Sequence, residues 1–183
     1  MSEPGSYLDM PVGRFLDVLS AGRPDPGGGS AAAVAVALAA ALCEMAARVS
    51  REGALAADAQ RLRDGVAALA QADADSYRGV LEARRLPPGT PERGEAISAA
   101  LSAASAVPIR VVETGVEVAG LAVRLAEKGN QNLRGDAETA ALIAAAGARA
   151  AGRLVAINLA DSPDDDRSTH VEHLLRNLPA TDA

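Results

Sequence analysis

Apolar positions along the chain recur every three or four residues, and β-branched residues never alternate with polar ones over the length of a strand. Such spacing aligns side chains along one face of an α-helix. We therefore expect an all-α fold, an up-and-down bundle of four long helices with shorter pieces at its ends. The pattern predicts these helices over residues 7–20, 31–51, 55–85, 92–128, 136–159 and 168–178.

Prolines and glycines mark the ends of the predicted helices. The two prolines and three glycines within residues 24–29 exclude a helix there, and Ser30 suits the N-cap of the helix that follows. Pro108 predicts a kink inside 92–128, because proline has no amide proton for the preceding turn. Gly129 is expected to end that helix.

The length of 183 residues predicts one domain, residues 1–183. Within it we expect a tail at residues 1–6 and an acidic loop with a short terminal helix at 161–183.

Composition makes the expected core unusual. The hydrophobic fraction is 49%, much of it alanine, whereas aromatic residues make up 2% and tryptophan is absent. Small side chains bury little area each, so the helices must approach closely and one subunit has a thin core. The segment 31–51 is apolar nearly all round, which places it at the centre of a bundle or at an interface. We expect a homodimer or higher homo-oligomer that associates through helices.

The formal net charge of −6 and the lack of a basic stripe argue against nucleic acid as a partner. The apolar run 31–43 is shorter than the roughly 20 residues that a membrane span needs. No leader pattern is evident at the start of the chain, and we expect a cytoplasmic protein. Cys43, the only cysteine, is expected to be a buried small hydrophobic residue.

Asp73 is the sharpest candidate for chemistry. It falls on the apolar stripe of the predicted helix 55–85, whereas Asp75 falls off it. A carboxylate on a buried stripe is costly unless it is paired or hydrogen-bonded, and burial raises its pKa toward the range useful for proton transfer. The alternative is a structural carboxylate that pairs with an arginine or a helix end.

Two further groups of residues are weaker candidates. Gly27, Gly28, Gly29 and Ser30 open a helix, where free amides bind anions, although a plain helix-breaking loop has the same composition. Asn130, Asn132 and Asp136 cluster between two predicted helices, where turn and N-cap roles explain them equally well.

We predict no metal site. His170 and His173 have the spacing of a ligand pair, but no third ligand is clear and a solvated helix face explains them.

Several short motifs occur in a familiar order over residues 8–161. They are Phe15-Leu16, Pro26-Gly27-Gly28-Gly29-Ser30, Asp73-Ala74-Asp75-Ser76-Tyr77, Leu86-Pro87, Val107-Pro108, Glu127-Lys128-Gly129-Asn130-Gln131-Asn132 with Asp136, and Ile157-Asn158-Leu159. Together they resemble the cyclodeaminase/cyclohydrolase family, which comprises the C-terminal domain of formiminotransferase-cyclodeaminase and stand-alone methenyltetrahydrofolate cyclohydrolases.

The resemblance implies an all-helical subunit that dimerises, with a folate site between chains and no tightly bound cofactor. It implies one of two reactions on a tetrahydrofolate substrate: hydrolysis of 5,10-methenyltetrahydrofolate, or closure of 5-formiminotetrahydrofolate with loss of ammonia. Hydrolysis of the methenyl form is slightly favoured over closure of the formimino form, because no formiminotransferase segment is attached.

The resemblance also implies roles for individual residues. Asp73 would act as acid and base, and Asp136, with Asn130 and Asn132, would orient the reacting carbon. The loop from Gly27 to Ser30 would contact the ligand through its amides.

The chain departs from the family pattern at several positions. A lysine-rich segment that usually follows the second helix is absent, and Arg51 is the residue left to contact folate carboxylates. Gly135 and Leu154 replace a serine and an asparagine of the family.

Two other functions remain open from sequence. One is an enzyme of the same fold that acts on a non-folate amidine or imine, which the missing lysines favour. The other is a non-catalytic helical interaction protein, whose site would be filled by side chains and whose Asp73 would be neutralised by an internal arginine.

Overall fold

The computed structural model describes residues 6–24, 26–162 and 164–179, and over these it is helical with no strand. The prediction of an all-α fold is confirmed. The elements are η1 Tyr7–Asp9, α1 Val12–Leu19, α2 Gly28–Val49, α3 Gly53–Arg84, α4 Pro91–Ala104, α5 Ala106–Lys128, η2 Gln131–Leu133, α6 Arg134–Asn158 and α7 Asp166–Arg176.

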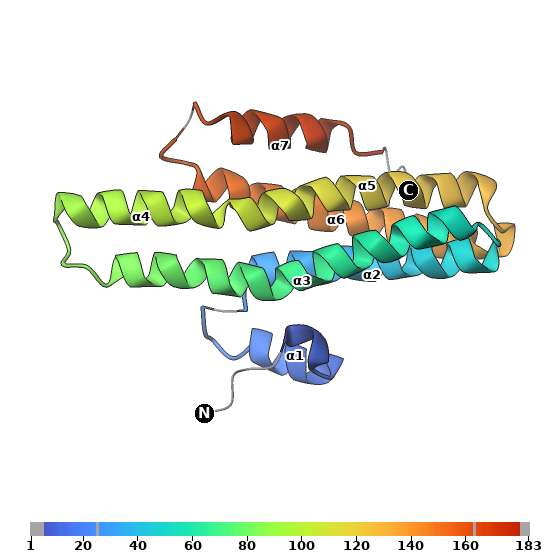
Figure 1. Ribbon diagram of the computed structural model, residues 1–183, viewed down its shortest axis with the longest axis horizontal. Coiled ribbons are helices and arrows are strands. Elements are labelled where there is room, and N and C mark those ends of the chain that lie inside the picture. Colours follow the sequence, from blue (N-terminus) through green and yellow to red (C-terminus); the bar gives the residue numbers. More distant parts are fainter. Residues whose placement is uncertain (1–5, 25, 163, 180–183) are drawn as a thin grey trace.

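Helices α2, α3, α5 and α6 form the bundle, and successive helices run in opposite directions (Figure 1). Helices α4 and α5 lie end to end. The C-terminal part of α3 and most of α4 run side by side beyond the ends of α2 and α6. Helix α7 packs against α5 and α6. The ends of α2 and α6 therefore meet the flank of the projecting α3–α4 pair.

Small residues set the helix spacing in the core, as the composition predicts. A Cβ added to Gly115 on α5 would lie 2.9 Å from the Cβ of Ala148 on α6. A Cβ added to Gly147 on α6 would lie 2.7 Å from a methyl group of Val36 on α2. Backbones this close leave no space for larger side chains, and alanine therefore replaces leucine as the main core residue.

Some predicted boundaries differ from the structure. The kink expected at Pro108 is a break at Ser105, which divides the predicted helix 92–128 into α4 and α5. Pro108 then lies in the first turn of α5, where proline is tolerated. Gly129 does end α5, but with a φ of −80°. Glycine is required there because a Cβ would lie 2.5 Å from the carbonyl oxygen of Leu125.

The prediction that Ser30 caps α2 is wrong. The helix begins two residues earlier, at Gly28, and its N-cap Gly27 provides no side-chain hydrogen bond. Ser30 lies inside the first turn, and its Oγ donates a 2.7 Å hydrogen bond to the carbonyl of Ala70 on α3. The first turn of α2 is held by a neighbouring helix instead of by its own cap.

The outward face of α2 is as apolar as its inward face. Its inner residues, including Val36, Ala40 and Cys43, are buried in the core. The outward positions recur at helical spacing and are only partly buried or exposed; they are Ala31, Val34, Ala35, Leu38, Ala41, Leu42, Met45 and Val49. Leu38 is 58% exposed and Val49 is 52% exposed.

Two helical stretches in the described chain are long and apolar enough to cross a membrane, as judged from length and composition alone. They are Gly28–Val49, with a mean hydropathy of 1.9, and Gln131–Asn158, with 1.5. The apolar run in α2 thus extends further than the 31–43 segment considered from sequence. About half of each stretch is buried within the bundle, which accounts for the apolar inner faces.

Candidate functional site

The first turn of α2 meets α3 at Asp73. The Oδ2 atom of Asp73 accepts a 3.0 Å hydrogen bond from the backbone N–H of Ser30. This amide is one of the free donors at the start of an α-helix, so the Asp73 carboxylate serves as the cap that Gly27 does not provide. The two residues are 43 positions apart in the chain.

Gly29 makes this approach possible. A Cβ at this position would lie 2.0 Å from Asp73 Oδ1 and 2.4 Å from Oδ2, closer than atoms can approach. The glycine-rich loop therefore brings the α2 backbone against a carboxylate of α3.

Burial raises the pKa of the Asp73 carboxyl above its ordinary value of 3.8, and hydrogen bonds from Ser30 lower it in part. Desolvation disfavours the charged form, whereas donors to the carboxylate favour it. The same group thus caps a helix and is biased toward exchanging a proton nearer neutral pH. Only Oδ2 accepts a hydrogen bond among the described residues, so Oδ1 is available to a ligand.

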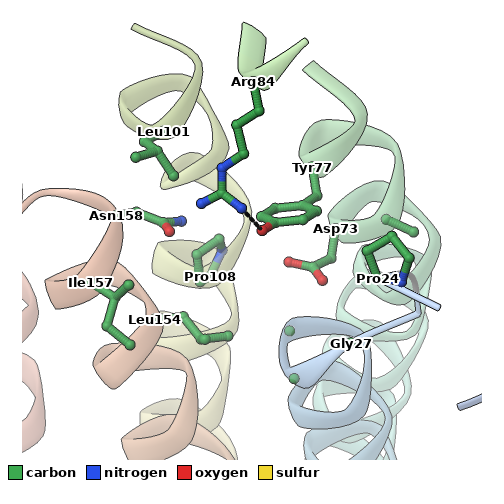
Figure 2. A pocket seen from close by; sticks show the side chains of 13 residues that line it. Pro24, Gly27, Asp73, Tyr77, Arg84, Leu101, Pro108, Leu154, Ile157 and Asn158 are labelled. Carbon is green, nitrogen blue, oxygen red and sulfur yellow. Dashed lines mark hydrogen bonds between the residues drawn. The ribbon is translucent and has the colours of Figure 1, made fainter. Parts of the chain in front are cut away.

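Asp73 lines a cavity of about 490 Å³ at the place where the α3–α4 pair projects beyond α2 and α6 (Figure 2). One wall belongs to α3 and carries Asp73, Tyr77 and Arg84. The opposite wall is mainly apolar and is formed by Leu101, Pro108, Leu154, Ile157 and Asn158. Gly27, Gly28, Gly29 and Pro24 close the end nearest α2. A size of this order and a few converging polar groups are typical of small-molecule sites.

Sequence reasoning missed three polar groups of this cavity: Tyr77, Arg84 and Asn158. Tyr77 lies four residues after Asp73 on the same face of α3, and from sequence it is only part of a motif. Arg84 follows the last apolar residue of the stripe, so helical spacing was the only available signal. Asn158 was recognised as part of a motif without a role.

The other predicted site residues lie at the opposite end of the bundle. There the N–H of Asn130 donates a 2.9 Å hydrogen bond to Ser50 Oγ, which ties the α5–α6 connection to the end of α2. The intervening helix α2 has 22 residues, about 33 Å at about 1.5 Å per residue. Arg51, Asn132 and Asp136 belong to the same end, and none of them lines the Asp73 cavity.

Each of these residues has a local structural explanation. Asn130 Oδ1 accepts a hydrogen bond from the N–H of Asn132 and caps η2. Asp136 lies in the first turn of α6, where a negative charge is favourable, but it is not the N-cap. Arg51 is exposed, with a φ of +61°, in the turn between α2 and α3. One subunit alone therefore does not bring Asp136 and Asp73 together.

Among the described residues, no group of three or more His, Cys, Asp or Glu side chains is arranged to hold a metal ion. His170 Nε2 lies 3.2 Å from Glu113 Oε1 on the exposed surface between α7 and α5.

The fold and cavity define a helical-bundle protein with a carboxylate-centred small-molecule site, and comparisons with known proteins assign its family. Residues 11–177 match the family model described as formiminotransferase-cyclodeaminase. The chain belongs to this family, as the ordered motifs predicted.

Two curated relatives span most of this chain. The methenyltetrahydrofolate cyclohydrolase of Methylorubrum extorquens is 35% identical, and the match covers 91% of this chain and 89% of the relative. The formimidoyltransferase-cyclodeaminase of Mus musculus is 32% identical, and the match covers 94% of this chain but only 35% of the longer mouse protein.

A solved structure has the same fold. The crystal structure of formiminotetrahydrofolate cyclodeaminase from Thermotoga maritima superposes with a TM-score of 0.81 at 26% sequence identity. The superposition covers 95% of this chain and 90% of the Thermotoga chain.

Proposed function

We propose that this protein is an enzyme of folate one-carbon metabolism that hydrolyses 5,10-methenyltetrahydrofolate to 10-formyltetrahydrofolate. The observation that carries the proposal is the Asp73 carboxylate, held on the first turn of α2 with one oxygen available at an open cavity. The similarity to a cyclohydrolase over nearly the whole of both chains supports this reaction over others.

Asp73 supplies both proton transfers in this reaction. As a base it takes a proton from water while the water oxygen bonds to the cationic carbon between N5 and N10. The N5–carbon bond then breaks, its electron pair passes to N5, and Asp73 returns the proton to that nitrogen. The hydroxyl proton of the intermediate is lost to solvent, which leaves the formyl group on N10. The negative carboxylate also stabilises the cationic substrate beside it.

The alternative of a non-catalytic interaction protein predicts a filled site and a carboxylate neutralised by arginine. The structure has neither feature, since the cavity is open and the described hydrogen-bond partner of Asp73 is Ser30. Asp73 does bind a helix end, as a structural carboxylate would. An Asp73→Asn variant keeps an oxygen to accept the Ser30 N–H and separates that role from proton transfer.

The second candidate function is closure of 5-formiminotetrahydrofolate with release of ammonia. The similarity to a cyclodeaminase of nearly the same length favours it specifically. The same carboxylate would protonate the departing nitrogen. A third candidate, hydrolysis of a non-folate amidine or imine, retains support from the missing lysine-rich segment.

We further propose that two copies of this chain associate through the outward apolar face of α2. Antiparallel pairing would place the end of one subunit that carries Asn130, Asn132 and Asp136 beside the Asp73 cavity of the other, a juxtaposition that one subunit does not achieve. Leu38→Glu would then yield monomers in sedimentation and lower the activity. A monomeric wild-type protein that is fully active would contradict this dimer.

We also propose that the protein is cytoplasmic, takes the folate as its substrate and holds no tightly bound cofactor.

The test of function compares two assays on one preparation of the full chain. The cyclohydrolase reaction is followed by the loss of 5,10-methenyltetrahydrofolate absorbance, and 10-formyltetrahydrofolate is identified as product by chromatography. The cyclodeaminase reaction is followed by ammonia release from 5-formiminotetrahydrofolate. Acceleration of the cyclohydrolase reaction supports the proposal, and acceleration of only the cyclodeaminase reaction replaces it with the second candidate function. If neither reaction is accelerated, hydrolysis of a non-folate amidine or imine is the remaining candidate.

A further inference from the structure

Arg84 differs from the other charged residues around the cavity. Among the described lining residues it is the only cationic one, and Asp73 is the only acidic one. Its Nη1 atom donates a 3.2 Å hydrogen bond to the hydroxyl of Tyr77, and its guanidinium carbon lies 6.0 Å from the centre of the Tyr77 ring. No described carboxylate pairs with Arg84, whereas Arg78 nearby pairs with Asp75 at 2.6 Å.

Three residues of α3 line the cavity in a fixed order. Tyr77 follows Asp73 by four residues and Arg84 follows it by eleven. At about 100° per residue, all three positions fall on one face of the helix. Figure 2 shows the resulting order, with the acid nearest α2, the aromatic ring beyond it, and the guanidinium above the ring. An elongated ligand lying along α3 meets an acid, a ring and a cation in turn.

The chemistry of a reduced folate has the same order. The reacting carbon joins N5 to N10, an aminobenzoyl ring follows N10, and an amide then links that ring to a glutamate with free carboxylates. With the reacting carbon at Asp73, the aminobenzoyl ring lies against Tyr77 and the carboxylates approach Arg84. Arginine suits this task, because its planar donors match a carboxylate in pairs.

We propose that Arg84 binds the glutamate carboxylate of the folate and so selects for substrates that carry this tail. The proposal rests on the proposed function, because it takes the folate as ligand. It also accounts for a feature of this chain. The lysine-rich segment expected to bind folate carboxylates is missing, and Arg51, its expected substitute, lies at the far end of the bundle from Asp73.

Equilibrium binding tests this inference without relying on catalysis. The probes are 5-formyltetrahydrofolate, which has the glutamate tail, and 5-formyltetrahydropteroate, which lacks it. Wild type is expected to bind the folate about tenfold or more tightly, as is typical of a charge-assisted hydrogen bond. Arg84→Gln should weaken binding of the folate but not of the pteroate, so the ratio of their two dissociation constants should fall close to one. Arg84→Lys should restore part of the difference in affinity.

Arg85 provides a matched control. It is the next residue, carries the same charge and is exposed, but it does not line the cavity. Arg85→Gln should keep the wild-type ratio. The proposal is overturned if Arg84→Gln leaves the affinity ratio unchanged or weakens binding of both ligands equally. It is also overturned if the wild-type protein binds the folate and the pteroate with equal affinity.

Kinetics separates this inference from the function on which it rests. In the cyclohydrolase assay, Arg84→Gln should raise KM about tenfold with kcat largely kept, because an ion pair to the tail exists in both the ground state and the transition state. If wild type hydrolyses the folate but Arg84→Gln keeps the wild-type ratio of affinities, only the role of Arg84 is contradicted and the proposed function stands. Failure of wild type to bind either probe contradicts both proposals.

Discussion

The carboxylate of Asp73 lies against the Cα atom of Gly29, so close that a methyl group on Gly29 would be 2.0 Å from Oδ1. This contact joins the glycine-rich loop to the acid of α3 and explains why the two motifs occur together in one chain. The glycine acts through the space that it leaves, because its φ is not in the left-handed region.

Gly29→Ala should therefore displace the Asp73 carboxylate from the Ser30 N–H and lower kcat/KM at least tenfold, since general acid–base catalysis contributes about 10²–10⁴-fold. Gly28→Ala should lose much less, because its methyl group would meet only Leu154 side-chain carbons, at 3.8 Å. Steady-state rates of the two variants, with thermal unfolding to compare stability, check this. Equal losses in both would show that the Gly29 contact is unimportant.

The raised pKa of Asp73 predicts how stability depends on pH. The folded protein holds the Asp73 proton more tightly than the unfolded chain does, so stability falls as pH rises from about 3.8 through the raised pKa, and is level above it. Asp73→Asn removes this titration. In denaturant titrations, the unfolding free energy of Asp73→Asn minus that of wild type should increase over that pH interval. A constant difference would mean that the carboxyl has its ordinary pKa.

The same group predicts the pH dependence of activity. Asp73 must be ionised to accept the proton of water, so kcat/KM of wild type should rise with pH along a limb that Asp73 sets. This limb should be missing from the residual activity of Asp73→Asn. A limb that persists unchanged in the variant would assign it to another group.

Arg51 is expected to cost stability. It has a φ of +61° at the end of α2, and its N–H and that of Glu52 bond back to Arg48 and Ala47 in the pattern that usually takes glycine. Arg51→Gly should raise the unfolding free energy by about 1 kcal/mol, the typical penalty of a left-handed L-residue. Glu52→Gly, at a φ of −91°, should lower it instead. Chemical denaturation measures both, and a loss on Arg51→Gly would contradict the assigned strain.

Cys43 should be inert in the native state. It is fully buried in α2, and burial raises the pKa of its thiol to about 12. Reaction with a disulfide reagent near pH 8 should wait for unfolding and accelerate sharply in denaturant, because the thiolate is the nucleophile. Rapid stoichiometric labelling in buffer would show that α2 opens readily.

Helical spacing was enough to predict the bundle and to place Asp73 on the inner face of α3, because both depend on local periodicity. Helical spacing could not predict the hydrogen-bond partner of Asp73. Ser30 is 43 residues away, and the contact depends on how α2 packs on α3. The same packing explains the incorrect N-cap, since α3 supplies the acceptor that the first turn of α2 needs.

The separation of Asp136 from Asp73 followed from topology but was not deduced from the sequence. In an up-and-down bundle, the α2–α3 and α5–α6 connections lie at the same end, whereas the start of α2 lies at the other. Arg84 was missed for a different reason. It follows the apolar stripe at a helix end, where a charged residue is ordinarily solvated.

We propose that Asp73 transfers protons to a folate, and the rate of 5,10-methenyltetrahydrofolate hydrolysis by wild type, Asp73→Asn and Asp75→Asn tests this. Asp75 is two residues away on the same helix, is exposed, and pairs with Arg78 outside the cavity. We predict a loss of about 10²-fold or more for Asp73→Asn and a near-normal rate for Asp75→Asn. Full activity of Asp73→Asn would contradict the claim.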